Sequence, residues 1–203
     1  MIIKTIAETS YRGMYKLTPE EGSSFFIRRE YLNSVDFDLL VPGFETTAEQ
    51  DDELMDAGLC AAVEFKAVDY LARAEQSRAG LRRKLIQKKY EIEYIDRSLD
   101  YLESSDYLSD RRFSRAWLNT RSTNHLEGRT RLLSELLSRG IDREIASDAV
   151  NEFFTEHDEE EICLKAYKKL LKTKSGDKLT AALVRQGFSI KQIRLAEEAV
   201  LSE

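Results

Sequence analysis

The sequence contains little cysteine, proline or glycine: two, two and nine residues respectively among 203. Cys60 and Cys163 lie far apart and have no Cys or His at ligand spacing nearby, which excludes a disulfide framework and a zinc site. Few prolines and glycines interrupt the chain, and Leu, Ala, Glu, Lys and Arg dominate from Ala61 onward. This composition predicts a mainly α-helical protein.

A long apolar run is also missing. The apolar stretch at residues 1–6 is too short for a signal peptide or a membrane span. Together with the two unpaired cysteines, this indicates a reduced, cytoplasmic setting without a membrane partner. Hydrophobic residues make up 42% of the chain and charged residues 33%, which is typical of a folded rather than a disordered protein.

The first 58 residues differ from the rest. Runs of β-type residues occur at Ile2 to Ile6, Met14 to Leu17 and Ser24 to Ile27, with Gly- and Ser-containing turns between them. They predict a small β-hairpin or three-stranded sheet. The segment is acidic, because residues 1–60 hold 5 basic and 12 acidic side chains.

The remainder of the chain repeats itself, with offsets of 51 and 47 residues between three copies. Five columns are apolar in every copy: Leu81, Leu132 and Leu179; Leu85, Leu136 and Leu183; Tyr90, Ile141 and Phe188; Ile95, Ala146 and Ile193; Leu102, Phe153 and Val200. The leucine pairs are four residues apart and so share one helical face. We therefore expect three tandem three-helix repeats at residues 59–108, 109–157 and 158–203, which form an elongated, curved array behind the β-rich segment 1–58.

Glycine marks the end of the second helix in two of the copies. Gly140 and Gly187 stand where the chain turns left-handed after a helix, and Lys89 takes this place in the first copy. A left-handed non-glycine residue costs on the order of 1 kcal/mol, so that helix either ends otherwise or tolerates the strain. The expected helix starts carry residues typical of N-caps: Ser77, Ser109 or Asp110, and Ser175 or Asp177.

Charge alternates with the same period. Residues 66–89 hold eight basic and two acidic side chains, and residues 91–106 hold one basic and six acidic ones. Residues 111–139 hold seven basic and two acidic side chains, and residues 142–161 one and nine. Residues 165–178 hold six lysines and one acid. Stacked repeats would therefore collect their basic first and second helices on one side and their acidic third helices on another.

This pattern has two interpretations. The plain one is solvated helix faces joined by ion pairs within each repeat, each worth roughly 0.2–1 kcal/mol. The functional one is a basic stripe that suits a phosphate backbone and an acidic stripe that suits a basic protein groove or repels duplex DNA. Recurrence at the repeat period favours a partner made of both protein and nucleic acid.

The sequence offers no catalytic arrangement. His125 and His157 are isolated, which is typical of ordinary surface or capping residues and not of a metal site. Gly128 and Gly176 lie in helix connections, so no glycine-rich phosphate loop follows a strand. We expect a protein that is not an enzyme and that needs no cofactor or metal.

Three motifs in a fixed order resemble the RecX proteins. They are Tyr70 to Leu81, Tyr107 to Trp117, and Gly128 to Leu132 followed by Glu135-Leu136 and Arg139-Gly140-Ile141. The resemblance implies a non-enzymatic regulator of recombination, DNA repair and the SOS response. Such a regulator binds along the RecA recombinase filament on single-stranded DNA and inhibits its growth, ATPase, strand exchange and co-protease activity. Ala74 and Lys89 depart from the family pattern, which weakens the contacts expected of the first repeat.

Carried onto this chain, the resemblance points to basic positions in the matched motifs as RecA or single-stranded DNA contacts: Arg73, Arg78, Arg82, Arg111, Arg112, Arg115, Arg121, Arg129 and Arg131. Each could instead serve the structure, and Arg111 and Arg112 could pair with the acids of the preceding helix. We expect a monomer whose direct affinity for single-stranded DNA is weak. Two other classes stay open: a direct DNA-binding protein, in which residues 129–150 could form a helix-turn-helix, and a helical adapter for unrelated proteins.

Overall fold

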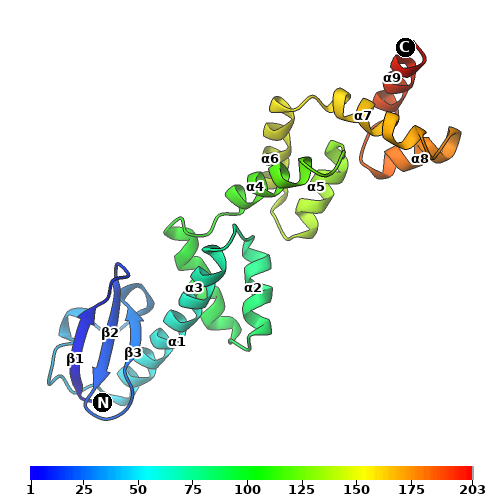
Figure 1. Cartoon of the computed structure of the whole chain (residues 1–203). Coiled ribbons are helices and arrows are strands. Elements are labelled where there is room, and N and C mark those ends of the chain that lie inside the picture. Colours follow the sequence, from blue (N-terminus) through cyan, green and yellow to red (C-terminus); the bar gives the residue numbers. More distant parts are fainter. Residues whose placement is uncertain (203) are drawn as a thin grey trace. The chain divides into compact units, whose positions relative to one another are not determined.

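In the computed structural model, which describes residues 1–202, the chain begins with an antiparallel sheet (Figure 1). Its strands β1 (Ile3–Glu8), β2 (Met14–Pro19) and β3 (Phe25–Arg28) lie in the order β1-β2-β3. Left-handed glycines turn the chain between them, with φ of 71° at Gly13 and 105° at Gly22. The three predicted β-type runs are confirmed. Two short 3-10 helices follow, η1 and η2, at Arg29–Tyr31 and Phe37–Leu39.

The long helix α1 (Ala48–Leu71) begins at a capping box, in which Thr47 and Gln50 bond each other's backbone N–H groups. Its first turns contain the acidic residues that the helix dipole favours at this end. Leu54 in its first half packs with the sheet, and Val63 in its second half packs with the first repeat. One helix therefore contributes residues to two hydrophobic cores. The domain boundary predicted at residue 58 falls inside this helix, and the boundary stays a prediction.

A buried ion pair ties β3 to α1. Arg28 donates from Nε to Glu64 Oε2 at 2.9 Å and from Nη2 to Oε1 at 2.6 Å, and the two side chains are 5% and 6% exposed. The Tyr31 hydroxyl donates to the same carboxylate at 2.8 Å. The guanidinium also lies 4.2 Å from the ring centre of Tyr101. Burial and the nearby Glu64 carboxylate together raise the pKa of Tyr31 far above its ordinary value.

Glu53 on α1 fixes the loop that precedes the helix. Its carboxylate accepts hydrogen bonds from the backbone N–H groups of Asn33, Ser34 and Val35 and from the Ser34 hydroxyl. Burial alone would raise the pKa of Glu53, but these bonds hold it at about 2. The ionised form is therefore the one that the fold stabilises.

Replacing Glu53 by Gln should lower the free energy of unfolding at neutral pH. Because the folded pKa of about 2 lies below the ordinary 4.5, this stabilisation is present above pH 4.5 and is lost as the pH falls toward 2. Urea unfolding of both proteins at several pH values should show the difference shrinking over that window. Glu21→Gln on the exposed turn is the control. A difference that does not change with pH would contradict the assignment.

The described residues form three tandem three-helix repeats that follow the sheet along the chain: α1 to α3, α4 to α6, and α7 to α9 (Figure 1). The remaining helices are α2 (Arg78–Gln87), α3 (Ile92–Ser104), α4 (Asp110–Ser122), α5 (Arg129–Ser138), α6 (Arg143–Glu156), α7 (Glu159–Leu171), α8 (Gly176–Arg185) and α9 (Ile190–Leu201). The aligned leucines at the centre of each second helix are all buried: Leu81, Leu85, Leu132, Leu136, Leu179 and Leu183. The predicted fold class, mainly α with three such repeats, is confirmed.

The second helices end as the glycines predict. Gly140 and Gly187 have φ of 83° and 95°, and Lys89 adopts the same left-handed conformation with φ of 68°. The first repeat thus tolerates the strain, at a cost of about 1 kcal/mol. At the helix starts, Ser109 caps α4 by accepting from the backbone N–H of Arg112.

Contacts divide the chain into two compact units. The first unit holds residues 1–74 and 81–108, and the second unit holds residues 75–80 and the chain from Ser109 on. The start of α2 thus belongs to the second unit.

One kind of contact occurs twice in the second unit. The backbone N–H of Arg78, the first residue of α2, donates to the carboxylate of Asp110 at 2.8 Å. The backbone N–H of Arg129, the first residue of α5, donates to that of Glu159 at 2.9 Å. Each carboxylate comes from the first turn of the next repeat. It accepts a hydrogen bond from a backbone N–H at the start of α2 or α5 that has no partner within that helix.

The left-handed glycines that follow α5 and α8, Gly140 and Gly187, also lie against the second helix of the preceding repeat. A Cβ added at Gly140 would meet the Cβ of Ala79 at 2.4 Å, and one added at Gly187 would meet the backbone N of Arg131 at 2.4 Å. Gly128 approaches Gly187 closely as well, and its N–H donates to the carbonyl of Gln186 at 2.9 Å. Glycine is therefore needed here both for its φ and for the close backbone approach.

Candidate functional site

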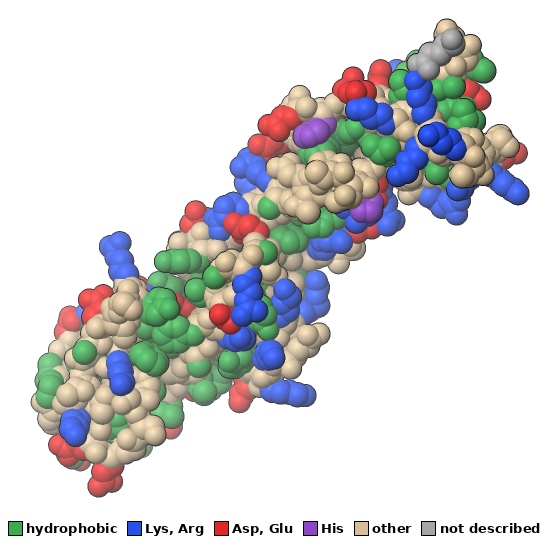
Figure 2. All heavy atoms as spheres, in the orientation of Figure 1, with side chains coloured by type: hydrophobic (Ala, Val, Ile, Leu, Met, Phe, Trp, Pro, Cys, Tyr) green, Lys and Arg blue, Asp and Glu red, His purple; other side chains and the backbone are tan. Residues whose placement is uncertain are grey.

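The nine predicted arginines lie on or beside the first and second helices of the first two repeats. Arg73 follows α1, Arg78 and Arg82 are on α2, four are on α4, and Arg129 and Arg131 are on α5. On the face drawn in Figure 2, Lys and Arg side chains gather over α2 and around the α7–α8 end of the chain.

Arg82, Arg111 and Arg115 form ion pairs with the third helix of their own repeat. Arg82 Nε lies 2.7 Å from Asp96, and Arg115 Nε lies 2.8 Å from Glu152. Arg111 pairs with Asp148 at 3.5 Å. These side chains are between 36% and 61% exposed, so each pair contributes at most about 1 kcal/mol. Pairs this weak can exchange the carboxylate for a phosphate group.

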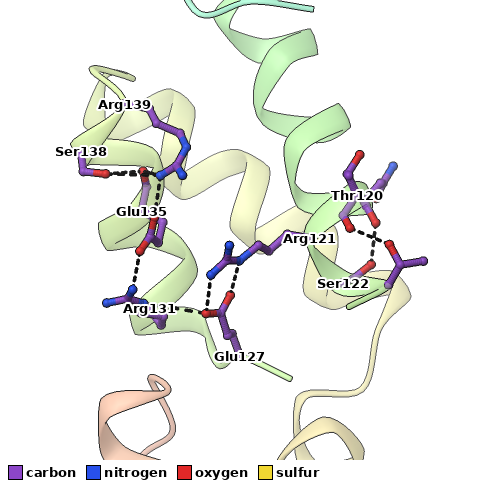
Figure 3. A network of polar contacts seen from close by, with 10 residues as sticks. Thr120, Arg121, Ser122, Glu127, Arg131, Glu135, Ser138 and Arg139 are labelled. Carbon is purple, nitrogen blue, oxygen red and sulfur yellow. Dashed lines mark hydrogen bonds and ion pairs between the residues drawn. The ribbon is translucent and has the colours of Figure 1, made fainter. Parts of the chain in front are cut away.

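Arg121 and Arg131 belong instead to a partly buried network (Figure 3). Arg121 donates two hydrogen bonds to the Glu127 carboxylate, at 2.7 and 2.9 Å. Glu135 accepts from Arg131 at 2.5 Å and from Arg139 at 2.6 Å. The two carboxylate side chains are only 11% and 18% exposed. Hydrogen bonding from Arg139 lowers the pKa of Glu135, so this network keeps its charges at neutral pH.

Trp117 on α4 supports the same network. Its ring lies 4.6 Å from the Arg139 guanidinium and 5.7 Å from that of Arg121. Trp117 also packs against the hydrophobic core of its repeat, so one ring contacts both the core and two cations. Arg121 therefore has several partners inside the chain.

Two further arginines pair with residues on neighbouring elements. Arg112 on α4 donates from Nε to Glu75, which follows α1, at 2.9 Å. Arg129 on α5 donates to Asn151 at 2.5 Å, lies 3.6 Å from Glu159, and sits over the ring of Phe154. These partners are far from the arginines in sequence, so the charge pattern of the sequence could not identify them.

A group of exposed lysines lies outside the predicted set. Lys169, Lys172, Lys174 and Lys178 lie in or next to the turn between α7 and α8. Among residues 1–202 no carboxylate lies within 4 Å of any of the four amino groups. The sequence carries the signal for this, because Asp177 is the sole acid between residues 165 and 178.

Other kinds of site find little support in the part of the chain that the structure describes. It contains no group of three or more His, Cys, Asp or Glu side chains that could hold a metal ion. Burial raises the pKa of Cys60 and of Cys163 to about 11, so both thiols are protonated at neutral pH. No helix within residues 1–202 combines the length and the apolar character that crossing a bilayer requires.

The repeats define a helical-repeat protein in which α2, α4 and α5 carry more basic than acidic side chains. Comparison with known proteins narrows this class. The sequence matches two family domains, described as the first three-helix domain of RecX at residues 66–102 and the second at residues 109–150. The chain belongs to the RecX family, a family of regulatory proteins.

Individual relatives agree. The regulatory protein RecX of Treponema pallidum (strain Nichols) is 35% identical over 153 residues, which cover 75% of this chain and 93% of that protein. That of Bacillus licheniformis is 31% identical over 188 residues, 87% and 72% of the two chains. A crystal structure of regulatory protein RecX shares the fold with a TM-score of 0.78 and 20% identity, covering 97% of this chain and 98% of the other. The crystal structure of RecX from Lactobacillus salivarius shares the fold with a TM-score of 0.62 and 21% identity, and the match covers 71% of this chain and 98% of the other.

Proposed function

We propose that this protein binds the RecA filament assembled on single-stranded DNA and inhibits its growth, ATPase, strand exchange and co-protease activity. It thereby acts as a negative regulator of homologous recombination and the SOS response, as a monomer in the cytoplasm. Membership in the RecX family is the observation that carries this proposal. The relatives are regulatory proteins, which supports a binding role and not a catalytic one.

Among the predicted contact residues, exposed arginines with weak partners suit the role best. Arg73, Arg111 and Arg115 are each more than half exposed and pair with equally accessible acids. A phosphate group or an acid of the partner can replace those acids at little cost. Arg121 is 25% exposed within the network, so we assign it a mainly structural role.

The direct test is a titration of RecA ATP hydrolysis on single-stranded DNA. The proposal requires suppression at substoichiometric amounts of this protein. Unchanged hydrolysis at equimolar protein would remove it.

Replacing Arg111, Arg112 and Arg115 together by Ala should raise the protein concentration needed for half-inhibition by roughly tenfold or more. Three charged groups are lost from one helix, and a hydrogen bond to a charged group contributes on the order of 1.5–3 kcal/mol. Helix content, measured by circular dichroism, should not change, because the lost ion pairs are at least one-third exposed.

A charge-matched control variant replaces Lys4, Arg12 and Lys16 on the N-terminal segment by Ala. It should inhibit RecA like the unaltered protein. If both variants inhibit equally well, the contact surface has been misplaced.

The exposed lysines of α7 and α8 favour a second candidate, direct binding to DNA. Such binding predicts a log affinity for bare DNA that falls with log salt by about 0.7–0.9 per phosphate contacted. Weak, salt-sensitive binding to bare DNA together with much tighter binding to RecA on DNA would support the first proposal. Equal affinity for both would support the second.

A further inference from the structure

A cavity in the second unit brings together both histidines of the chain. Its volume is about 290 Å³, and it lies between the C-terminal end of α4, the following loop, and helices α5, α6 and α7. His125 comes from the loop and His157 from the end of α6. Sequence reasoning treated the two as isolated surface or capping residues, and they are 32 positions apart.

The cavity has an apolar floor and a cationic rim. Leu126, Leu132, Phe153 and Ile162 supply apolar surface. The rim carries two cations, Arg121 and Lys165, and one carboxylate, Glu127, which Arg121 already binds. Lys165 pairs with Glu161, but both side chains are about 60% exposed, so this pair is weak. Because Glu127 occupies Arg121, Lys165 is the cation of the rim that an anionic ligand can pair with.

An ordered aromatic stack forms one wall. The rings of His157 and Phe153 are 4.1 Å apart and 12° from parallel. His157 Nδ1 lies 2.9 Å from the Phe153 carbonyl oxygen. A carbonyl can only accept, so Nδ1 carries the hydrogen and the imidazole is held in one orientation. A planar ligand entering the cavity meets a ring that is already in place.

We propose that this cavity takes one nucleotide of a single-stranded nucleic acid. The base stacks on the His157–Phe153 pair above the apolar floor, and the phosphate lies at the rim near Lys165 and His125. Stacking platforms beside cations are the chemistry by which proteins bind single strands without reading sequence. The ligand class rests on the proposed function, since RecA assembles on such a strand.

The test compares two ligands in the absence of RecA: an oligothymidylate and an abasic phosphodeoxyribose strand of equal length. Fluorescence anisotropy should show tighter binding of the strand that carries bases. His157→Ala should reduce affinity for oligothymidylate by roughly 5- to 150-fold, the range of one lost base stack, and change abasic binding little. His157→Phe, which keeps a ring, should retain the preference.

A matched control separates stacking from charge. The double variant Lys172→Ala and Lys174→Ala, at the turn outside the cavity, should weaken binding of both strands equally. Equal affinity of the unaltered protein for the two strands would overturn the proposal. A competition experiment gives a second contrary outcome. If an acidic peptide displaces oligothymidylate and the abasic strand does not, the cavity binds a protein side chain and the proposal is overturned.

A second measurement needs no variant. Ultraviolet cross-linking of the unaltered protein to an oligonucleotide with 5-bromodeoxyuridine should attach the base within residues 121–127 or 153–165. Attachment only at the exposed aromatic rings of Tyr11 and Phe26 would overturn the proposal. Because neither experiment contains RecA, their outcome is independent of whether the protein inhibits RecA.

Discussion

Replacing Glu64 by Ala should lower the free energy of unfolding of the first unit by about 3–5 kcal/mol, the range measured when one partner of a buried ion pair is removed. The Arg28 guanidinium, which is 5% exposed, would lose the acceptor of two hydrogen bonds. The Tyr31 hydroxyl would lose its acceptor as well. An unpaired buried charge costs far more than the missing contact itself.

Because the chain has a single tryptophan, the stability of the two units can be measured separately. Trp117 lies in the second unit, so its fluorescence reports unfolding there, whereas hydrogen exchange of the β3 amides reports the first unit. In Glu64→Ala the β3 amides should exchange much faster while the Trp117 transition moves little.

The matched control replaces both partners by apolar residues, Arg28→Met with Glu64→Leu. Removing both charges should restore most of the stability, because apolar side chains of similar volume often replace a buried pair without loss. Should Glu64→Ala cost less than about 1 kcal/mol, the pair does not hold β3 on α1.

Replacing Gly187 by Ala should lower the free energy of unfolding of the second unit by roughly 2–5 kcal/mol. A Cβ at this position would lie 2.4 Å from the Arg131 backbone N and 2.9 Å from the Gly128 carbonyl oxygen, neither of which can rotate away. Overpacking of this kind costs about 1–3 kcal/mol. The left-handed φ of 95° adds roughly 1–2 kcal/mol for a residue with a side chain.

Gly176→Ala separates the two contributions. Gly176 also has a positive φ, 52°, but a Cβ there would meet nothing within 4 Å. Its replacement should cost only the backbone strain. Urea unfolding followed by Trp117 fluorescence gives both values, and equal losses in the two variants would show that the close contact with Arg131 contributes nothing.

The repeat architecture was predictable because it depends on local periodicity. Leucines four residues apart, as in Leu132 and Leu136, fix one buried face per helix wherever that helix lies. Gly140 predicts a helix end because the left-handed conformation is a property of one residue. Lys89 obeys the same geometry without being glycine, so the position in the repeat, and not the residue type, decides the turn.

The partners of the charged residues could not be predicted in the same way. The charge pattern indicates which helices are basic, but a long arginine side chain can reach acids on several elements. Arg112 selects Glu75, 37 positions earlier, although the acids of the preceding helix were also candidates. The lysines of α7 and α8 were left out of the predicted contacts for another reason: the candidates came from the motifs that resemble RecX, and those motifs end at Ile141.

The sequence by itself determined the helical class, the three repeats, the β-rich start and the helix ends, because each follows from neighbours within one or two turns of the chain. Tertiary structure alone decided that Arg28 meets Glu64 in the interior, that Gly187 lies against Arg131, and that the two histidines share one cavity. These contacts join residues far apart in sequence, and their geometry depends on how whole helices pack, which no local pattern specifies.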